Sequence, residues 1–476
     1  MAAIVQFIKD LKITVEPIMF LLAAANSFRQ IVIPKLAEDK MKLVYPPPMA
    51  NMTHDQLKKF YNTKMVEWDN NYQYVNLPIA CILGIMYGGF SDHYGRKLPL
   101  LIGLNSLIVE TALRMLMYSP ETNWSLEWIF PTAVIAGLLG DQLLTMSCIN
   151  AYVTDTFDNK KTLSIRMIIV SIMFSLGSFV SSRTVRAILQ HDLLSEIGIL
   201  GIAEGMYALT FIIGIIILTN VVPKKKHAVP REEQIVATAD EESPIVAVDL
   251  PEKKTLLQII YLSFYSIYEA GHIFIIPREG HKRLFLYLCF FANFLDQLVF
   301  GEEKGLIGTY TRLAPFEWTS STYADYKSWR PIVQILGMLV GMLVFKNWLK
   351  LKDTMVICFA ISSMGACVLM IGLAKATWVI FASLLPGSLH GLLNPLTYSF
   401  MSCLVEPDEI GKAYAMSTIA QKLAEMAQTA ILQNIYIATL NWYQGFVWIL
   451  MSAISFVAVL VYAFVHVLAI SEDIGA

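Results

Sequence analysis

The sequence predicts an all-α membrane protein with twelve transmembrane helices in two six-helix bundles. Three observations lead to this prediction. Hydrophobic residues make up 56% of the 476 residues and charged residues only 16%, whereas a soluble domain carries roughly 25% charge. Twelve apolar runs are long enough to cross the hydrocarbon core as helices, which takes about 20 residues. A polar interval divides these runs into six and six.

The first six runs form the N-terminal half. We expect spans at 14–34, 73–91, 98–118, 128–152, 166–188 and 197–221. The chain start lacks the basic region and small-residue cleavage site of a signal peptide, so the first run is expected to remain as a span. Residues 1–221 are therefore expected to form one six-helix bundle.

The polar interval, residues 222–283, is expected to be a central cytoplasmic loop. It opens with three consecutive lysines from Lys224 and continues with an acidic stretch poor in aromatic residues. This composition is typical of disorder. From Leu256 onward the interval is apolar, which fits either an interfacial helix or a segment miscounted as a further span.

The second six runs form the C-terminal half, residues 284–476. We expect spans at 284–303, 328–346, 354–373, 376–402, 413–436 and 445–469. Two homologous halves that face each other would place the substrate site at their interface, near the bilayer midplane. The sequence holds no strong repeat between the halves, so this expectation rests on the pattern of spans.

Positive charges in the short loops predict that both termini are cytoplasmic. Such charges follow span two, at Arg96, and span four, at Lys160. The first outer loop opposes the rule with six lysines. Two glycosylation sequons, at Asn51 and Asn123, fall on the non-cytoplasmic side of the same topology. The protein is expected in the plasma membrane, with the lysosomal membrane as the alternative because EKKTLL at 252–257 fits a sorting motif.

The composition and motifs exclude several classes of function. A net charge of −2 gives no reason to expect nucleic-acid binding. The six cysteines all lie in apolar segments and lack the spacing of metal ligands. The sequence contains neither HExxH nor GxSxG, so we expect no enzyme activity, no metal and no cofactor. The expected partners are a small-molecule substrate and the lipid bilayer, with protons as the candidate coupling ion.

The motif GGFSDHYGRKLP, which begins at Gly88, lies between the second and third spans. Glycines allow helices to approach closely, and Gly95 permits a tight turn. As a plain structural feature, this would be a charged turn on the cytoplasmic side. The motif resembles the signature loop of the major facilitator superfamily, G-x-x-x-D-x-x-G-R-[RK]. That resemblance implies a cytoplasmic gate in which Asp92 and Arg96 form the latch.

Four further segments resemble solute carrier family 46, which contains the proton-coupled folate transporter. They are ITVEPIMFL at 13–21, GDQLLTMSCINAYVTD at 140–155, the RM pair at 166–167 and ATLNWYQGF at 438–446. The resemblance implies the major facilitator fold and transport of a small solute. Three positions depart from the folate transporter: its fifth-span glutamate is Ser171 here, its tenth-span arginine is Tyr398, and no histidine lies between 284 and 303. Other members are associated with organic anions, steroid conjugates and cell-wall-derived molecules.

Ionisable residues within the predicted spans are the candidate functional residues. A charge at the centre of a span costs at least about 2.5–3.5 kcal/mol, so it is kept where it pairs or lines a wet path. The candidates for binding substrate or a proton are Arg29, Glu110, Arg114, Asp141, Asp296 and Glu425. Asp155 and Arg166, at the cytoplasmic ends of their spans, are expected to join Asp92, Gly95 and Arg96 in the gate.

Several candidates have two readings. Arg29 could bind an anion through its guanidinium or extend to the outer interface. Glu110 and Arg114 are four residues apart on one helical face, which fits an internal ion pair better than a substrate contact. Asp141 could carry a proton or serve as a structural hydrogen-bonding group. His390 could titrate near neutral pH, but a lone histidine beside glycines more often bonds a backbone carbonyl, and we expect the latter.

Two arginines near the end of the fifth span, Arg183 and Arg186, are expected to anchor at the membrane interface. The function expected overall is secondary active transport of a small organic solute, with an anion favoured, by alternating access. The alternative is a transporter-like sensor that binds solute without moving it. The gate motif argues against the sensor, because a sensor needs no working gate.

Overall fold

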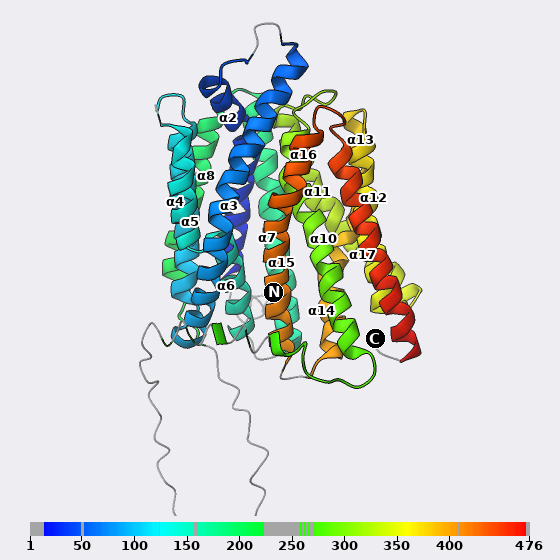
Figure 1. The fold of residues 1–476 in the computed structure, drawn as a ribbon. Helices are drawn as coiled ribbons and strands as arrows, with labels where there is room; N and C mark the ends of the chain where they lie inside the picture. The colour runs from blue at the N-terminus through cyan, green and yellow to red at the C-terminus, as the bar shows by residue number, and fades with distance from the viewer. Residues whose placement is uncertain are drawn as a thin grey trace, which may run out of the picture.

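The computed structural model describes residues 14–48, 52–122, 124–156, 160–222, 271–406 and 409–472, together with five isolated positions between 258 and 268. All regular secondary structure in this described part is helical, as predicted. Figure 1 shows long helices running side by side between two ends of the molecule. We call the end that carries Val44 and His54 the outer end, and the end that carries Gly95 the inner end.

The N-terminal helices pack against one another through their apolar faces. They are α2 (Glu16–Val44), α3 (His54–Tyr94), α4 (Lys97–Tyr118), η1 (Leu126–Trp128), α5 (Ile129–Leu138), α6 (Asp141–Thr156), α7 (Lys160–Gln190) and α8 (Glu196–Ile217). α2 packs against α7 and α8, and α4 packs against α6 and α8. Ile18, Leu22, Leu104 and Tyr207 are almost fully buried in these contacts.

The C-terminal helices are divided into more segments than the N-terminal helices. They are α10 (Lys282–Tyr310), α11 (Ser320–Gly341), η2 (Met342–Trp348), α12 (Asp353–Leu373), α13 (Thr377–Ala382), η3 (Pro386–Leu392), α14 (Leu393–Leu404), α15 (Ile410–Ala427), η4 (Gln428–Gln433), α16 (Asn434–Thr439) and α17 (Phe446–Ser471). α17 packs along α12 and α10, and η3 packs against α11 and α12.

Each predicted span falls on helical structure. Within the described residues, eight helical segments are long and apolar enough to cross a membrane: Glu16–Val44, Lys97–Tyr118, Glu196–Ile217, Lys282–Tyr310, Ser320–Trp348, Asp353–Leu373, Thr377–Met401 and Phe446–Ser471. The count of twelve spans and the division at 222–283 stay predictions. The apolar segment after Leu256 lies mostly outside the described residues.

The predicted first outer loop is mostly helix. α3 has 41 residues and is therefore about 61 Å long, roughly twice the thickness of the hydrocarbon core. Thr53 caps it in a capping box with Gln56. Lysines of this region pair with nearby acids, including Lys35 with Asp39 at 2.6 Å.

Two helices break where the sequence makes a regular helix costly. The fourth predicted span is divided into α5 and α6 at Gly140, which has a φ of +86° and is followed by Asp141 with a φ of +55°. A left-handed conformation is cheap for glycine and costly for most other residues. The tenth predicted span becomes 3₁₀ at η3, which begins at Pro386, as a proline-induced interruption would produce.

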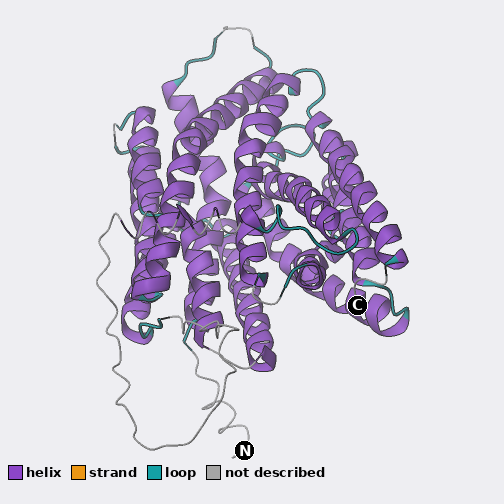
Figure 2. Cartoon of the chain, turned by 60° about the horizontal axis from the view of Figure 1, so that its bottom comes forward, coloured by secondary structure: helices purple, strands orange, loops and turns teal. Residues whose placement is uncertain are grey.

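The N-terminal and C-terminal helices meet along two lines of contact. α7 packs against α11, and α3 packs against α15 and η4. Figure 2 shows the helices tilted so that the inner end comes forward. α2 also touches α10 and α11, and Gln30 on α2 bonds Lys327 on α11, so the middle of α2, which carries Arg29, lies near the boundary between the groups.

Candidate functional site

A buried ion network lies inside the N-terminal helices. Nη1 of Arg29 on α2 donates to Oε2 of Glu110 at 2.7 Å, and Nε of Arg114 donates to Oε1 of the same carboxylate at 2.8 Å. The three side chains are between 5% and 11% exposed. The guanidinium of Arg114 also lies 4.2 Å from the centroid of the Tyr72 ring. The structure thus contains the expected Glu110–Arg114 pair and adds Arg29 to it.

More acids surround this network than its two arginines balance. Asp69 interacts electrostatically with Arg114, while Asp141 and Glu204 interact with Arg29. Oε2 of Glu204 is buried and has no hydrogen-bond partner within the described part of the chain. With every acid ionised, the cluster would be negative. An added anion would therefore be favoured only if protons neutralised part of the acids.

A second buried pair joins α10 to η3. Nε2 of His390 lies 2.9 Å and 3.1 Å from the two carboxylate oxygens of Asp296. The side chain of Asp296 is fully buried and that of His390 is 4% exposed. The expectation that His390 bonds a backbone carbonyl is therefore wrong. The irregular η3 segment turns the imidazole toward α10, and a carboxylate is the stronger acceptor in a dry environment.

A third pair was missed by sequence reasoning. Nη1 of Arg330 on α11 donates to Oε1 of Glu303 on α10 at 2.8 Å, and Nη2 donates to the second oxygen. The carboxylate is almost fully buried, and the Tyr326 hydroxyl lies 3.4 Å from it. Both charged residues sit at the edges of predicted spans, where a charge usually faces the interface. The opposite charges of these two residues, on consecutive predicted spans, were the feature of the sequence that could have indicated the pair.

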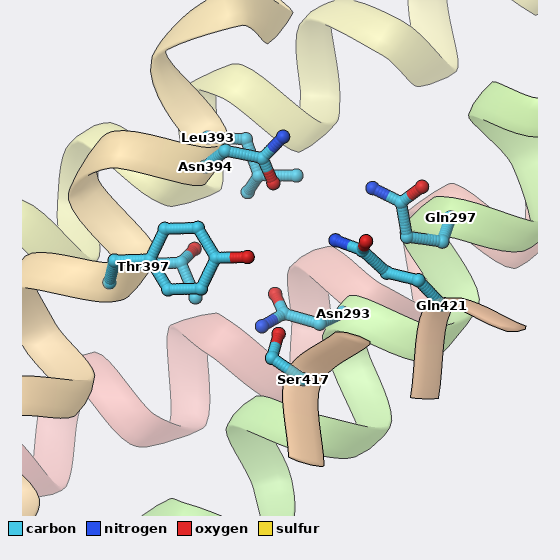
Figure 3. Close-up of a pocket in the computed structure, with 8 residues that line it drawn as sticks. Asn293, Gln297, Leu393, Asn394, Thr397, Ser417 and Gln421 are labelled. Carbon is cyan, nitrogen blue, oxygen red and sulfur yellow. The ribbon is translucent and has the colours of Figure 1, made fainter. Parts of the chain in front are cut away.

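A small polar pocket opens between α10, α14 and α15 (Figure 3). The residues that line it are Asn293, Gln297, Leu393, Asn394, Thr397, Tyr398, Ser417 and Gln421. Four carboxamides and three hydroxyls provide both hydrogen-bond donors and acceptors and carry no formal charge. Glu425 lies one turn beyond Gln421 on α15 and pairs with Lys422 at 3.7 Å.

The predicted gate residues gather at the inner end. Gly95 ends α3 with a φ of +102°, which turns the chain into α4. Nε of Arg96 donates to Oδ2 of Asp155 at 2.6 Å, and Nη1 contacts the Ser91 hydroxyl. Arg166 binds Glu16. The side chain of Asp92 lies outside the described part of the structure.

Ion pairs at the outer end join the N-terminal and C-terminal helices. Arg183 and Arg186 on α7 donate to Oδ1 of Asp325 on α11, at 2.8 Å and 2.7 Å. Lys58 on α3 binds Glu317 at 2.7 Å. That the two arginines anchor at the membrane interface stays a prediction; the structure adds that both bind the partly exposed carboxylate of Asp325 across the α7–α11 contact.

Further contacts at the outer end also join the N-terminal and C-terminal helices. Nδ2 of Asn62 on α3 donates to the carbonyl of Thr309 at 2.8 Å, and the Tyr436 hydroxyl donates to Oδ1 of Asn62 at 2.9 Å. Arg312 binds Glu38. At the inner end, by contrast, four ion pairs each join elements of one group: Arg96–Asp155, Arg166–Glu16, Arg278–Glu409 and Lys346–Asp353. Both sequon asparagines, Asn51 and Asn123, lie outside the described residues.

Comparisons with known proteins agree with this architecture. The family model of the Major Facilitator Superfamily matches residues 75–426. The chain is 21% identical over 455 residues to the lysosomal proton-coupled steroid conjugate and bile acid symporter SLC46A3 of Gallus gallus, covering 92% of this chain and 91% of the relative. It is 22% identical over 380 residues to the probable peptidoglycan muropeptide transporter SLC46 of Drosophila melanogaster, covering 78% and 66%.

Solved structures share the fold at lower identity. A transporter of the POT family, crystallised with a thioalcohol-conjugated peptide, has a TM-score of 0.62 at 12% identity and covers 96% of each chain. The human organic anion transporter MFSD10 has a TM-score of 0.57 at 14% identity, covering 94% of this chain and 97% of its own. At these identities the likeness establishes the shared all-helical transporter architecture.

Proposed function

The chain belongs to the major facilitator superfamily, whose members are membrane transport proteins rather than enzymes, and on that premise we propose that it moves a small organic solute by alternating access. The observation that supports this proposal is the uneven distribution of ion pairs between the outer and inner ends of the described structure. At the outer end, Arg183, Arg186 and Lys58 bind acids of the other group, while the four inner-end pairs named above, among the described residues, each join elements of one group. This arrangement fits a state closed to the outside and ready to open toward the cytoplasm.

We propose that the solute carries an anionic group. Arg29 and Arg114 are two buried cations of the N-terminal helices that lie side by side on one carboxylate, and a guanidinium binds a carboxylate or sulfate in two-point geometry. Both already share Glu110, so a solute anion would have to compete with that carboxylate or add to it. The names of the two relatives support this class, because bile acids, steroid conjugates and muropeptides include anionic compounds.

The excess of acids explains why protons are the proposed coupling ion. An anion that approaches Arg29 also meets Asp141 and Glu204. Loading a proton onto an acid at the same time removes this repulsion, which links the two ligands thermodynamically. Asp296 and Glu425 provide further acids in the C-terminal helices.

The topology proposed from the sequence puts both termini in the cytoplasm and the sequons outside. Under it, residues 1–221 and 284–476 are the two moving halves and 222–283 is the cytoplasmic loop between them. The plasma membrane and the lysosomal membrane are the two candidate compartments, and the relative from Gallus gallus is lysosomal by name. Imaging of the tagged chain, with and without Leu256→Ala and Leu257→Ala, decides between them.

Uptake into proteoliposomes tests the proposed function. Labelled taurocholate, estrone sulfate and a muramyl dipeptide are offered at external pH 5.5 and 7.4 with an internal pH of 7.4. Uptake of at least one probe, faster at pH 5.5, is the expected result. Saturable binding without uptake would instead make the protein a sensor, and neither binding nor uptake would reject all three solute classes.

A further inference from the structure

One ring nitrogen of His390 in the Asp296–His390 pair is available to bind a proton. An ionised carboxylate only accepts hydrogen bonds, so with Asp296 ionised the nitrogen that faces it, Nε2, carries the proton. Nδ1 of His390 then keeps a lone pair. This atom is buried and has no hydrogen-bond partner among the residues that the structure describes. A buried polar atom without a partner is costly unless it has a use, and a lone pair of this kind can receive a proton.

The pair also lies between two pockets. On α10, Asn293 and Gln297 flank Asp296 and line the polar pocket of Figure 3. One and two turns further along α10, Phe300 and Glu303 line a second pocket. The same holds on the other side of the pair: Leu393 and Asn394 belong to the first pocket, and Gly387 and Ser388 belong to the second. The pair therefore lies, on both of its chain segments, between residues that line one pocket and residues that line the other.

Phe300 separates the pair from the ion pair of the second pocket. Its ring centroid lies 4.3 Å from that of His390 and 5.9 Å from the guanidinium carbon of Arg330. The packed elements carry other ionisable side chains within the bundle: Glu303 on α10, Arg330 on α11, Cys367 on α12, Tyr398 on α14, Lys422 and Glu425 on α15, and Tyr462 on α17. Arg330 is already bound by Glu303, which leaves Asp296 as the carboxylate that bonds the imidazole.

We propose that the Asp296–His390 pair holds the proton that drives solute transport. This inference rests on the proposed function and names the residues that would perform its coupling. A proton from the outer solution binds Nδ1 of His390 and gives an imidazolium beside the Asp296 carboxylate. The pair changes from one net negative charge to none, so it can be enclosed at low cost while the helices rearrange. On the cytoplasmic side the proton leaves Nδ1 and the imidazole is restored.

The irregular η3 segment makes the pair movable. A 3₁₀ stretch between α13 and α14 lacks the regular hydrogen bonds of an α-helix. Protonation at His390 can therefore be transmitted to Asn394 and Leu393 in the polar pocket by a small shift of one chain segment. Solute in that pocket and the proton on His390 would then favour the same conformation, as coupling requires.

A proton-binding measurement tests the pair without any solute. The chain has eight histidines, and the 15N signals of His390 in a histidine-labelled sample are identified by their loss in His390→Gln. In lipid, Nδ1 of His390 should change from unprotonated to protonated between about pH 5 and 8, the range in which imidazoles titrate. A His390 signal that stays constant across this range overturns the proposal.

A transport measurement tests the use of the proton. With external pH 5.5 and internal pH 7.5, one proton per solute supports up to about 100-fold accumulation, since each pH unit corresponds to a tenfold ratio. His390→Gln and Asp296→Asn should accumulate taurocholate or muramyl dipeptide hardly above onefold while exchanging labelled for unlabelled probe within about threefold of wild type. His466→Gln, which changes a histidine bonded to Thr354, should keep accumulation.

The outcomes separate the two proposals. Accumulation retained in both pair variants, or accumulation and exchange lost in equal measure, overturns the role of the pair. A wild-type protein that titrates at His390 but moves none of the probes supports the proton site and rejects the proposed solutes. Retained exchange also establishes that a variant is folded, so loss of accumulation cannot be assigned to misfolding.

Discussion

Arg29 on α2 and Glu110 on α4 form a buried ion pair at 2.7 Å, although 81 residues separate them in the chain. The same carboxylate binds Arg114. Removing this acid would leave two cations without their shared partner. The pair therefore ties α2 to α4 and sets the electrostatics of the N-terminal helices.

Glu110→Gln should lower the free energy of unfolding by about 3–5 kcal/mol, the usual cost of breaking a buried ion pair on one side. The measurement is reversible unfolding in mixed detergent and SDS micelles. Glu121→Gln changes an exposed glutamate between α4 and η1 and should leave stability within about 0.5 kcal/mol. Equal stability of the two variants would mean that the network is hydrated rather than buried.

Asp325→Asn should open the outer end. The neutral amide no longer holds Arg183 and Arg186, each of which contributes up to about 1 kcal/mol at this partly exposed site. Spin labels at Gln190 on α7 and Ser321 on α11 measure the distance distribution across this interface. A larger fraction of long distances is expected.

Asp39→Asn is the matched control for Asp325→Asn. Asp39 pairs with Lys35 and Lys42 within α2 and does not connect the two groups of helices, so its variant should retain the wild-type distances. A distribution unchanged by Asp325→Asn would assign the closure to other contacts, such as those of Asn62.

Arg96→Ala should slow turnover more than it weakens solute binding. Arg96 bonds Asp155 and Ser91 at the inner end, where it acts on the gate rather than on the solute. Loss of a charged hydrogen bond worth about 1.5–3 kcal/mol predicts a turnover lower by roughly 10- to 100-fold. Arg283→Ala, an exposed arginine at the start of α10, should have little effect. Equal losses in binding and turnover would place Arg96 in contact with the solute.

The Lys58–Glu317 contact should not respond to mild acid. The hydrogen bond and the charge of Lys58 lower the pKa of Glu317 below its ordinary value. A carboxylate of lowered pKa stabilises the closed outer end fully above its ordinary pKa of about 4.3 and loses this effect only as pH falls through the lowered value. Any change in the spin-label distances between pH 7.4 and 5.5 should therefore be the same in Glu317→Gln as in wild type. A pH response in this range that Glu317→Gln abolishes would contradict the assignment.

Hydropathy predicted where helices lie in the membrane but not how far they extend beyond it. α3 begins at His54, 19 residues before the predicted start at 73, because the added turns carry Lys58, Lys64 and other polar residues. Outside the hydrocarbon, a helix needs no apolar run, so hydropathy gives no signal there. The capping box at Thr53 was the local feature that marked the true start.

Pairs within one helix could be predicted, and pairs between helices could not. Glu110 and Arg114 share a helical face by spacing alone. Asp296 and His390 are 94 residues apart, and Glu303 and Arg330 are 27 apart. Which charges meet depends on how helices rotate about their axes when packed, and a single sequence does not contain this rotation. The irregular backbone at η3 also changes the direction of the His390 imidazole, which the spacing of a regular helix does not predict.

Because α3 is so long, a small tilt in the middle of this helix produces a large displacement at its outer end. Lys58 lies 22 residues from Ala80 on the same helix, which corresponds to about 33 Å. A tilt of only about 5° around Ala80 would move Lys58 by roughly 3 Å, further than a hydrogen bond can stretch. Small adjustments in the middle of the helix are thus magnified at its tip, where Asn62 and Lys58 hold the opposite group of helices.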